Sequence, residues 1–188
     1  MRCSCELLVP VMVLAACVTG LAQSRPYNVG SVPPPEEVRA FDVRVGPSGK
    51  ELPPGSGTAK EGATLYAQRC AACHGANGAG GTANRLVAKT PATAEDGPEH
   101  GTIAYYPYAT IAWDFINRSM PANKPGSLSA NEVYAVTAYL LFRNGIIQES
   151  DALDAKSLPK VQMPNRDGFV PDPRPDVTTP KDSSDVQP

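Results

Sequence analysis

Cys70-Ala71-Ala72-Cys73-His74 is the stretch that decides how the whole chain is interpreted. Two cysteines at this spacing, followed at once by a histidine, are the pattern that attaches a haem group covalently. Each thiol can form a thioether with one vinyl group of the haem, and the neighbouring imidazole is then held beneath the iron. The sequence therefore predicts one covalent haem c, attached through Cys70 and Cys73, with His74 as the proximal iron ligand.

The other cysteines support this interpretation. The chain has five cysteines, and Cys3, Cys5 and Cys17 all lie near the N-terminus. A mature protein without that segment has only Cys70 and Cys73, which excludes a framework of several disulfides. Two thiols so close together could instead exchange disulfides, but the histidine that follows them favours haem attachment.

The first 22 residues have the features of an export signal. Arg2 gives a positive start, and the apolar run Leu7–Val18 is too short to span a bilayer. The small residues of Gly20-Leu21-Ala22 suit cleavage, so we expect a signal peptide over residues 1–22 and a periplasmic protein. Alternatively, Leu14-Ala15-Ala16-Cys17 resembles a lipoprotein signal, in which Cys17 would carry a lipid anchor.

The composition indicates one modest domain with extended segments on both sides. The chain has 188 residues, twenty prolines and a formal net charge of −2, and its basic residues are not clustered as nucleic-acid binding would require. We expect an extended N-terminal segment over 23–57, a folded domain over 58–147 and a polar, extended tail over 148–188. The partial alternation of Val38–Val45 leaves open a brief strand or an extended strap against the domain.

Three helices are predicted within the domain, over Thr58–Cys70, Tyr108–Ser119 and Ser129–Asn144. Thr58 with Glu61, and Ser129 with Glu132, have the spacing of capping boxes that start a helix. Gly145 supplies the stop of the last helix. The first helix thus leads directly into the haem-attachment motif.

A methionine is the expected sixth iron ligand, because a thioether favours the reduced iron. Met120 lies between two predicted helices, on a loop that Pro121 and Pro125 would stiffen, and is the favoured candidate. Met163 is the alternative, although it would require the tail to cover the haem. His100 lies in a loop sequence and is expected to be solvated.

Several side chains near Met120 have two interpretations that the sequence does not separate. The aromatic residues Tyr105, Tyr106, Tyr108 and Trp113 could line the haem pocket or belong to the general core. Arg118 could pair with a haem propionate, but a surface arginine at a helix end is the simpler expectation.

The motif and its flanking helices resemble the class I cytochromes c. Gly62 and Tyr66 on the first helix and Tyr139 on the last resemble the small and aromatic residues where the terminal helices of that family cross. The resemblance implies an all-α fold, here the class I cytochrome c fold with extended Pro-rich N- and C-terminal segments. In that family the methionine ligand precedes the last helix, which again favours Met120.

A more specific resemblance is to the monohaem cytochrome subunits of bacterial sulfite dehydrogenases and to the related sulfane dehydrogenase cytochrome. It is carried by the stretches Leu52–Thr58, Cys70–Gly75, Tyr106–Thr110, Met120–Pro121 and Met163–Phe169. It implies a protein that is not an enzyme on its own. It would take single electrons from a molybdopterin-containing catalytic subunit and pass them to another cytochrome c. The Pro-rich segments 27–57 and 148–175 would then form part of the docking surface.

Two other functions remain open from sequence. The cytochrome could serve a different dehydrogenase, for example one that oxidises alcohols or thiosulfate, because no residue here would touch the substrate. A catalytic haem enzyme such as a peroxidase would need an open sixth position on the iron and a polar residue beside it.

Overall fold

The computed structural model describes residues 30–88 and 102–170. The chain divides into two compact units, residues 1–42 and 43–188. His100 and the predicted signal peptide, with its possible lipid site at Cys17, lie outside the described residues. Among those described, no helix has the length and apolar character needed to cross a membrane.

In the first unit the described residues form one short helix, α2 (Pro35–Phe41). The strand considered for Val38–Val45 is therefore wrong over its first half. Pro35 stands at the first helical position, and Glu36 and Glu37 occupy the first turn, where acidic side chains favour a helix. These start signals outweigh the partial alternation that follows them.

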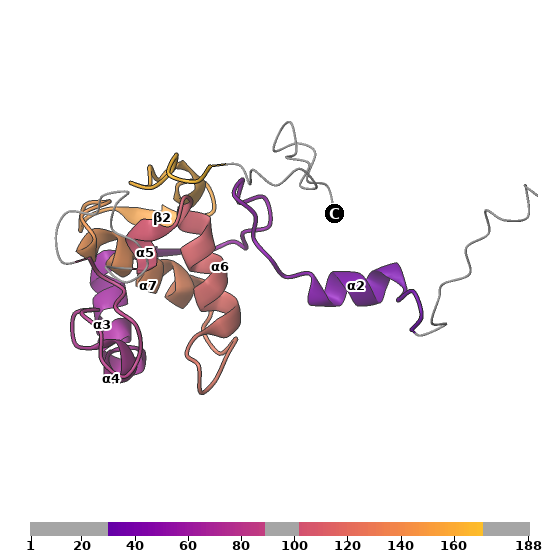
Figure 1. The fold of residues 1–188 in the computed structure, drawn as a ribbon, viewed down its shortest axis with the longest axis horizontal. Coiled ribbons are helices and arrows are strands. Elements are labelled where there is room, and N and C mark those ends of the chain that lie inside the picture. Colours follow the sequence, from indigo (N-terminus) through magenta and orange to yellow (C-terminus); the bar gives the residue numbers. More distant parts are fainter. Residues whose placement is uncertain (1–29, 89–101, 171–188) are drawn as a thin grey trace, which may run out of the picture. The chain divides into compact units, whose positions relative to one another are not determined.

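The second unit is built on two crossing helices, α3 (Ala59–Arg69) and α7 (Ala130–Arg143) (Figure 1). Both begin as predicted, because both capping boxes form. Thr58 and Ser129 accept the backbone N–H of Glu61 and Glu132, and each glutamate accepts the N–H of its cap residue in return. Gly145 follows α7 with a φ of 70°, a conformation that suits glycine.

The crossing of α3 and α7 depends on Gly62. A Cβ at Gly62 would collide with the backbone carbonyl of Ala135 on α7. One turn further along, the rings of Tyr66 and Tyr139 lie 5.0 Å apart with an interplanar angle of 41°. The residues expected from the cytochrome c resemblance at this crossing therefore make it.

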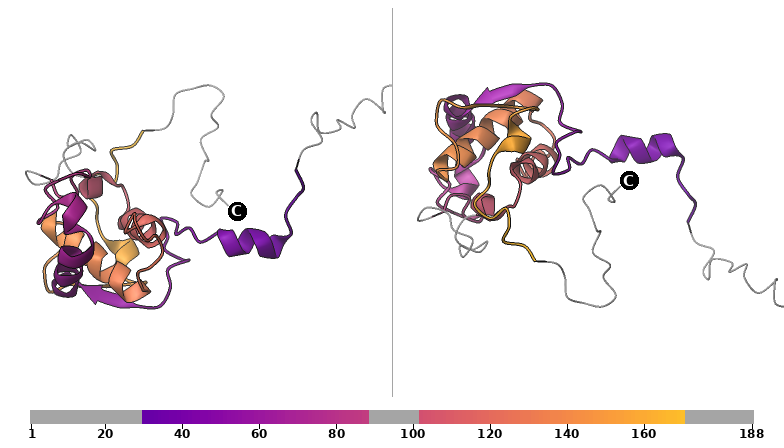
Figure 2. Two further views of the ribbon diagram at one scale, coloured as in Figure 1. Left: turned by 90° about the horizontal axis from the view of Figure 1, so that it is seen from below. Right: turned by 90° about the horizontal axis from the view of Figure 1, so that it is seen from above.

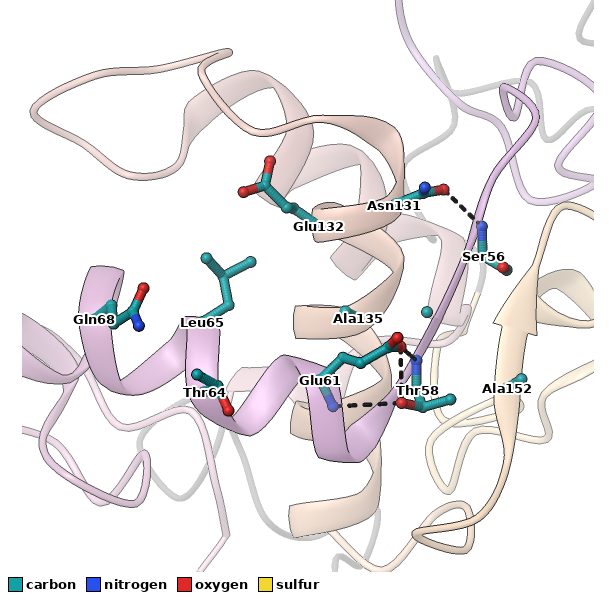
Figure 3. A pocket seen from close by; sticks show the side chains of 11 residues that line it. Ser56, Thr58, Glu61, Thr64, Leu65, Gln68, Asn131, Glu132, Ala135 and Ala152 are labelled. Atoms are coloured by element: carbon teal, nitrogen blue, oxygen red, sulfur yellow. Dashed lines mark hydrogen bonds between the residues drawn. The ribbon is translucent and has the colours of Figure 1, made fainter.

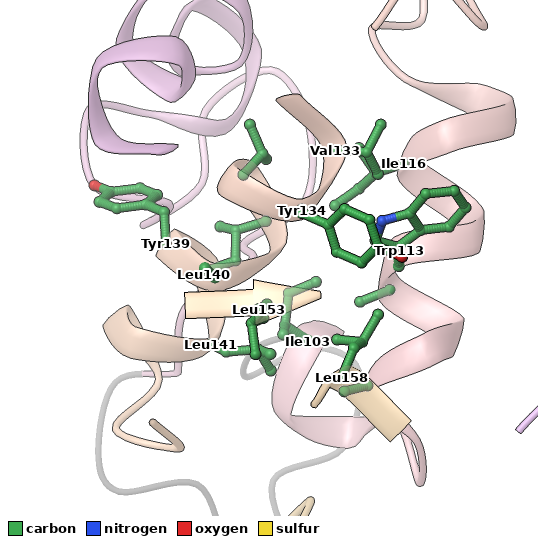
Figure 4. Packing of buried hydrophobic residues seen from close by; sticks show 14 of the residues in the cluster. Ile103, Trp113, Ile116, Val133, Tyr134, Tyr139, Leu140, Leu141, Leu153 and Leu158 are labelled. Carbon is green, nitrogen blue, oxygen red and sulfur yellow. The ribbon is translucent and has the colours of Figure 1, made fainter. Parts of the chain in front are cut away.

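The third long helix, α6 (Ala109–Ser119), packs against α7 and completes the core (Figure 4). Trp113 is fully buried with its ring 5.4 Å from that of Tyr134. Ile116 and Val133 lie in the same cluster. The short helices α4 (Ala71–His74) and α5 (Thr102–Tyr105) complete the helical part of the unit (Figure 2).

Segments on both sides of the helices join the same core. β1 (Ser56–Thr58) pairs antiparallel with β2 (Ala152–Asp154), and Gly57 stands opposite Leu153. The 3-10 helix η2 (Leu158–Lys160) follows. Val45, Leu52, Leu153, Leu158, Val161 and Met163 are all buried. The expected polar tail is thus, up to residue 163, a strap whose apolar side chains complete the domain.

Candidate haem-binding site

The attachment motif is one tight turn at the end of α3. Cys70 ends α3 and starts α4, and the backbone N–H groups of Cys73 and His74 both donate to the Cys70 carbonyl, at 3.2 and 3.0 Å. Cys70 is half-buried and Cys73 is exposed. The two thiols and the imidazole are therefore brought together on one short segment.

The environment of Cys70 opposes disulfide exchange. Burial and, to a smaller extent, the nearby Cys73 raise the pKa of the Cys70 thiol to about 11. A thiol is a nucleophile in disulfide exchange only as its thiolate. At neutral pH Cys70 is therefore a poor nucleophile for disulfide exchange.

His74 is oriented by a backbone carbonyl. Its Nδ1 lies 2.8 Å from the carbonyl oxygen of Asn84. A carbonyl can only accept, so in the neutral imidazole Nδ1 carries the proton and Nε2 has its lone pair free. An imidazole held in this way presents Nε2 to a metal in a fixed direction. The sequence did not indicate Asn84, because the contact uses its backbone and not its side chain.

The loop between His74 and Ala88 is held compactly beside the motif. Ala83 N–H donates to the Cys73 carbonyl at 2.9 Å, and Gly80 N–H donates to the His74 carbonyl at 2.9 Å. The Tyr66 hydroxyl donates to the carbonyl of Gly75 at 3.0 Å. The loop therefore holds the Asn84 carbonyl in place against the imidazole.

The two candidate methionines have different surroundings. Met120 follows α6 directly as its C-cap and is half-buried against the core. Met163 is 3% exposed and is enclosed in the core cluster. An axial ligand needs its sulfur at the surface of the haem pocket, which suits Met120 better. In Figure 1, α4 and the loop after α6 lie at the same end of the domain.

The residues present fit a haem c. The donor set contains two thiols on one turn, an imidazole whose Nε2 is free and a thioether on a second element, which are the groups that haem c attachment and axial ligation use. Partly buried apolar side chains that pack on the core accompany them, among them Ala71, Leu86 and Tyr106. Burial also raises the pKa of Tyr106.

The other side chains near Met120 have contacts of their own. Trp113 belongs to the core. The guanidinium of Arg118 binds the carboxylate of Asp114, with its Nε 3.0 Å from Oδ1. Tyr105 and Tyr108 contact the tail, through the ring of Phe169 at 5.4 Å and the guanidinium of Arg166 at 4.2 Å.

A separate groove of about 540 Å³ lies between α3, β1 and the start of α7 (Figure 3). Its walls include both capping glutamates, Glu61 and Glu132. Hydrogen bonds from Thr58 and Ser129 lower the pKa of these two carboxyls. None of the candidate haem-binding residues lines this groove, so it is not the haem site.

Comparison with known proteins finds a family model and a solved structure that match this chain. A family model for cytochrome c matches residues 59–142. The crystal structure of the sulfane dehydrogenase SoxCD from Paracoccus pantotrophus matches with a TM-score of 0.67 and 35% sequence identity, over 79% of this chain and 73% of that one.

A thiosulfate dehydrogenase from Stutzerimonas stutzeri (strain A1501) is 33% identical over 104 residues, which is 50% of this chain. The chain spans one third of the length of this relative, since the match covers 33% of it.

Proposed function

The chain belongs to the cytochrome c family, and from this premise we propose that it is the electron-accepting subunit of a sulfur-oxidising dehydrogenase in the periplasm. As a cytochrome c it carries covalent haem c and transfers electrons. The observation that supports the finer assignment is the match to sulfane dehydrogenase, with 35% identity over 79% of the chain. The match extends well beyond the helices that any cytochrome c shares.

We assign the haem contacts as follows. Cys70 and Cys73 provide the thioether attachments, His74 is the proximal ligand and Met120 is the distal ligand. The haem supplies one-electron oxidation and reduction when bound. The protein's own contribution is to orient His74 through the Asn84 carbonyl and to present the Met120 sulfur at the end of α6.

The proposed electron donor is a molybdopterin-containing subunit that oxidises sulfite, and the proposed acceptor is a second cytochrome c. Sulfite oxidation releases two electrons, which a single haem takes up one at a time. No acid, base or nucleophile of this chain is needed for that step. A peroxidase function is less well supported, because it would require an open iron position and Met120 is available to fill it.

Thiosulfate is the second candidate for the oxidised substrate of the complex. The 33% identity to a thiosulfate dehydrogenase supports it. The two candidates differ only in the partner, since in both this chain receives electrons.

Export is part of the same proposal, with either cleavage after residue 22 or a lipid at Cys17. The mass of the mature protein distinguishes these two outcomes.

The experiment that tests the proposal is reconstitution of the complex. The haem-loaded chain is mixed with a purified molybdopterin-containing sulfite dehydrogenase subunit, and haem reduction is followed by absorbance after sulfite or thiosulfate is added. We expect rapid reduction with sulfite. Reduction only by thiosulfate with its own dehydrogenase favours the second candidate, and no reduction by either contradicts the proposal.

The tail's share in docking needs a test that leaves the fold intact. Deletion of residues 148–188 would remove the buried Leu153 and Leu158 along with the exposed residues. Phe169 and Val170 are 53% and 85% exposed, so the double variant F169S/V170S removes exposed apolar surface and, within the fold, only the ring contact of Phe169 with Tyr105. We expect it to weaken binding of the catalytic subunit. The matched control is Phe115→Ser on α6, where the side chain is 44% exposed.

A further inference from the structure

We propose that Asn144 is a positioning residue for the haem: through the loop of residues 84–88, it fixes the carbonyl that orients the proximal ligand His74. This inference rests on the assignment of His74 made under the proposed function. It does not depend on which dehydrogenase the cytochrome serves. Asn144 hydrogen-bonds Leu86 and Ala88, and His74 hydrogen-bonds Asn84, which lies two residues before Leu86 on the same loop.

Asn144 uses its whole side chain at the end of α7. It is the C-cap of the helix and is 8% exposed. Its Nδ2 donates to the carbonyl of Leu140 within the helix, at 2.7 Å, and to the carbonyl of Leu86 in the loop, at 3.2 Å. Its Oδ1 accepts the backbone N–H of Ala88 at 3.0 Å. The side-chain amide therefore connects the loop to the helix both as a donor and as an acceptor.

The residues that Asn144 holds lie only two to four positions after Asn84, whose carbonyl contacts His74. Leu86 N–H and Val87 N–H both donate to the Gly78 carbonyl, at 2.9 and 3.0 Å. Two residues before Leu86, the Asn84 carbonyl accepts the proton of His74 Nδ1. Val87 is buried, and Asn144 hydrogen-bonds its two neighbours, Leu86 and Ala88. This part of the loop therefore has little freedom to shift.

α7 also contacts the chain further back, between His74 and residue 84. Arg143, the neighbour of Asn144, donates from Nη1 to the side-chain oxygen of Asn77 at 2.8 Å. The end of α7 thus contacts the chain at Asn77 through Arg143 and at Leu86 and Ala88 through Asn144, and the contacts of Asn144 are the nearer to Asn84 in sequence. Asn144 is therefore the residue of α7 best placed to control the imidazole.

The expected effect on the iron follows from the Nδ1–H bond. A carbonyl that accepts this proton increases electron donation from the imidazole and stabilises the oxidised iron. If the loop loosens, the bond weakens, the His74 proton exchanges faster and the reduction potential becomes more positive. A residue that only stabilised the fold would not change the ligand's proton in this selective way.

The test uses the full-length, haem-loaded protein without any partner, so its outcome is independent of the sulfite assay. Asn144→Ala is compared with wild type by NMR exchange of the His74 Nδ1 proton in the reduced state and by redox titration. Loss of a hydrogen bond predicts exchange faster by about fivefold or more. Asn144→Ser, whose side chain is shorter by one bond, is measured alongside in case the alanine variant does not fold.

Thr137→Val is the matched control, because it removes a buried side-chain hydrogen bond that lies entirely within α7: Thr137 Oγ1 donates to the Val133 carbonyl at 2.7 Å. The proposal holds if the Asn144 variant that folds changes both the exchange rate and the potential while the control changes neither. It is overturned if the folded Asn144 variant leaves both unchanged, or if the control changes them equally.

Discussion

Gly62 of α3 and Ala135 of α7 meet backbone to backbone, with no space for a side chain between them. This contact sets how closely the two helices cross, and therefore where α3 ends and delivers Cys70 and His74. Helix backbones approach this closely only where one residue lacks a Cβ.

We therefore predict that Gly62→Ala destabilises the protein by at least about 2 kcal/mol, because the added methyl group must push the helices apart. Denaturant unfolding of the haem-loaded protein measures this. Gly46→Ala is the control, since a Cβ there meets only the side chain of Glu51, at 3.6 Å. Equal stability of the two variants would contradict the role of Gly62.

Replacement of each methionine separates ligation from packing. Met120→Ala should abolish the absorption band of the methionine–iron bond and lower the reduction potential, because a soft ligand of the reduced iron is lost. Met163→Ala should keep the band and lower the stability by about 2–5 kcal/mol, because its buried side chain leaves a cavity. Loss of the band in Met163→Ala instead would reverse the ligand assignment.

Asp114 connects the segment before the domain helices to α6. Its buried carboxylate accepts the Val45 N–H at 2.9 Å and binds Arg118. Asp114→Ala should cost about 2 kcal/mol of unfolding free energy, since the buried N–H loses a charged acceptor. Arg118→Ala should cost less than about 1 kcal/mol, because its side chain is 38% exposed and ion pairs at the surface are weak. Thermal unfolding in both variants tests this order.

Tyr66 should make the protein sensitive to alkali. Burial raises the pKa of Tyr66 to about 12, above the ordinary value of about 10 that it has when unfolded. The neutral hydroxyl therefore stabilises the fold fully below pH ~10, and this contribution is lost as the pH rises towards 12. Tyr66→Phe lacks the hydroxyl that donates to Gly75, so it should be less stable than wild type at pH 8. Because it has no hydroxyl to ionise, its free energy of unfolding should fall less than that of wild type between pH 8 and pH 11. If the free energy of unfolding falls as steeply between pH 8 and pH 11 in Tyr66→Phe as in wild type, Tyr66 is not the group responsible.

The sequence was sufficient for the helices because their signals are local. Thr58 and Ser129 each meet their glutamate three residues on, and both capping boxes form as expected. The pair of Asp114 and Arg118, four residues apart on one helix, is a local signal too. α2 shows the reverse case, in which Pro35 and the acidic first turn mattered more than a weak alternation.

The rest of the site depends on contacts between distant segments, which have no local pattern. β1 and β2 pair across the whole set of helices, and Asn144 reaches Leu86 and Ala88 through a side chain that in sequence is only a helix cap. The Asn84 contact uses a backbone carbonyl, so no residue type indicates it. The motif thus predicts the haem, while the groups that orient its ligand appear only in the folded chain.

The pairing of Ser56 with Asp154 has a consequence for how this domain can be built into larger proteins. The strand before the first cytochrome helix and the strand after the last lie side by side, so the polypeptide enters and leaves the helical unit at neighbouring points. A helical unit whose entry and exit strands pair can be joined in tandem or inserted into another chain when the core-forming segments 43–55 and 155–163 go with it. Such a unit is suited to reuse as an interchangeable module within longer electron-transfer polypeptides.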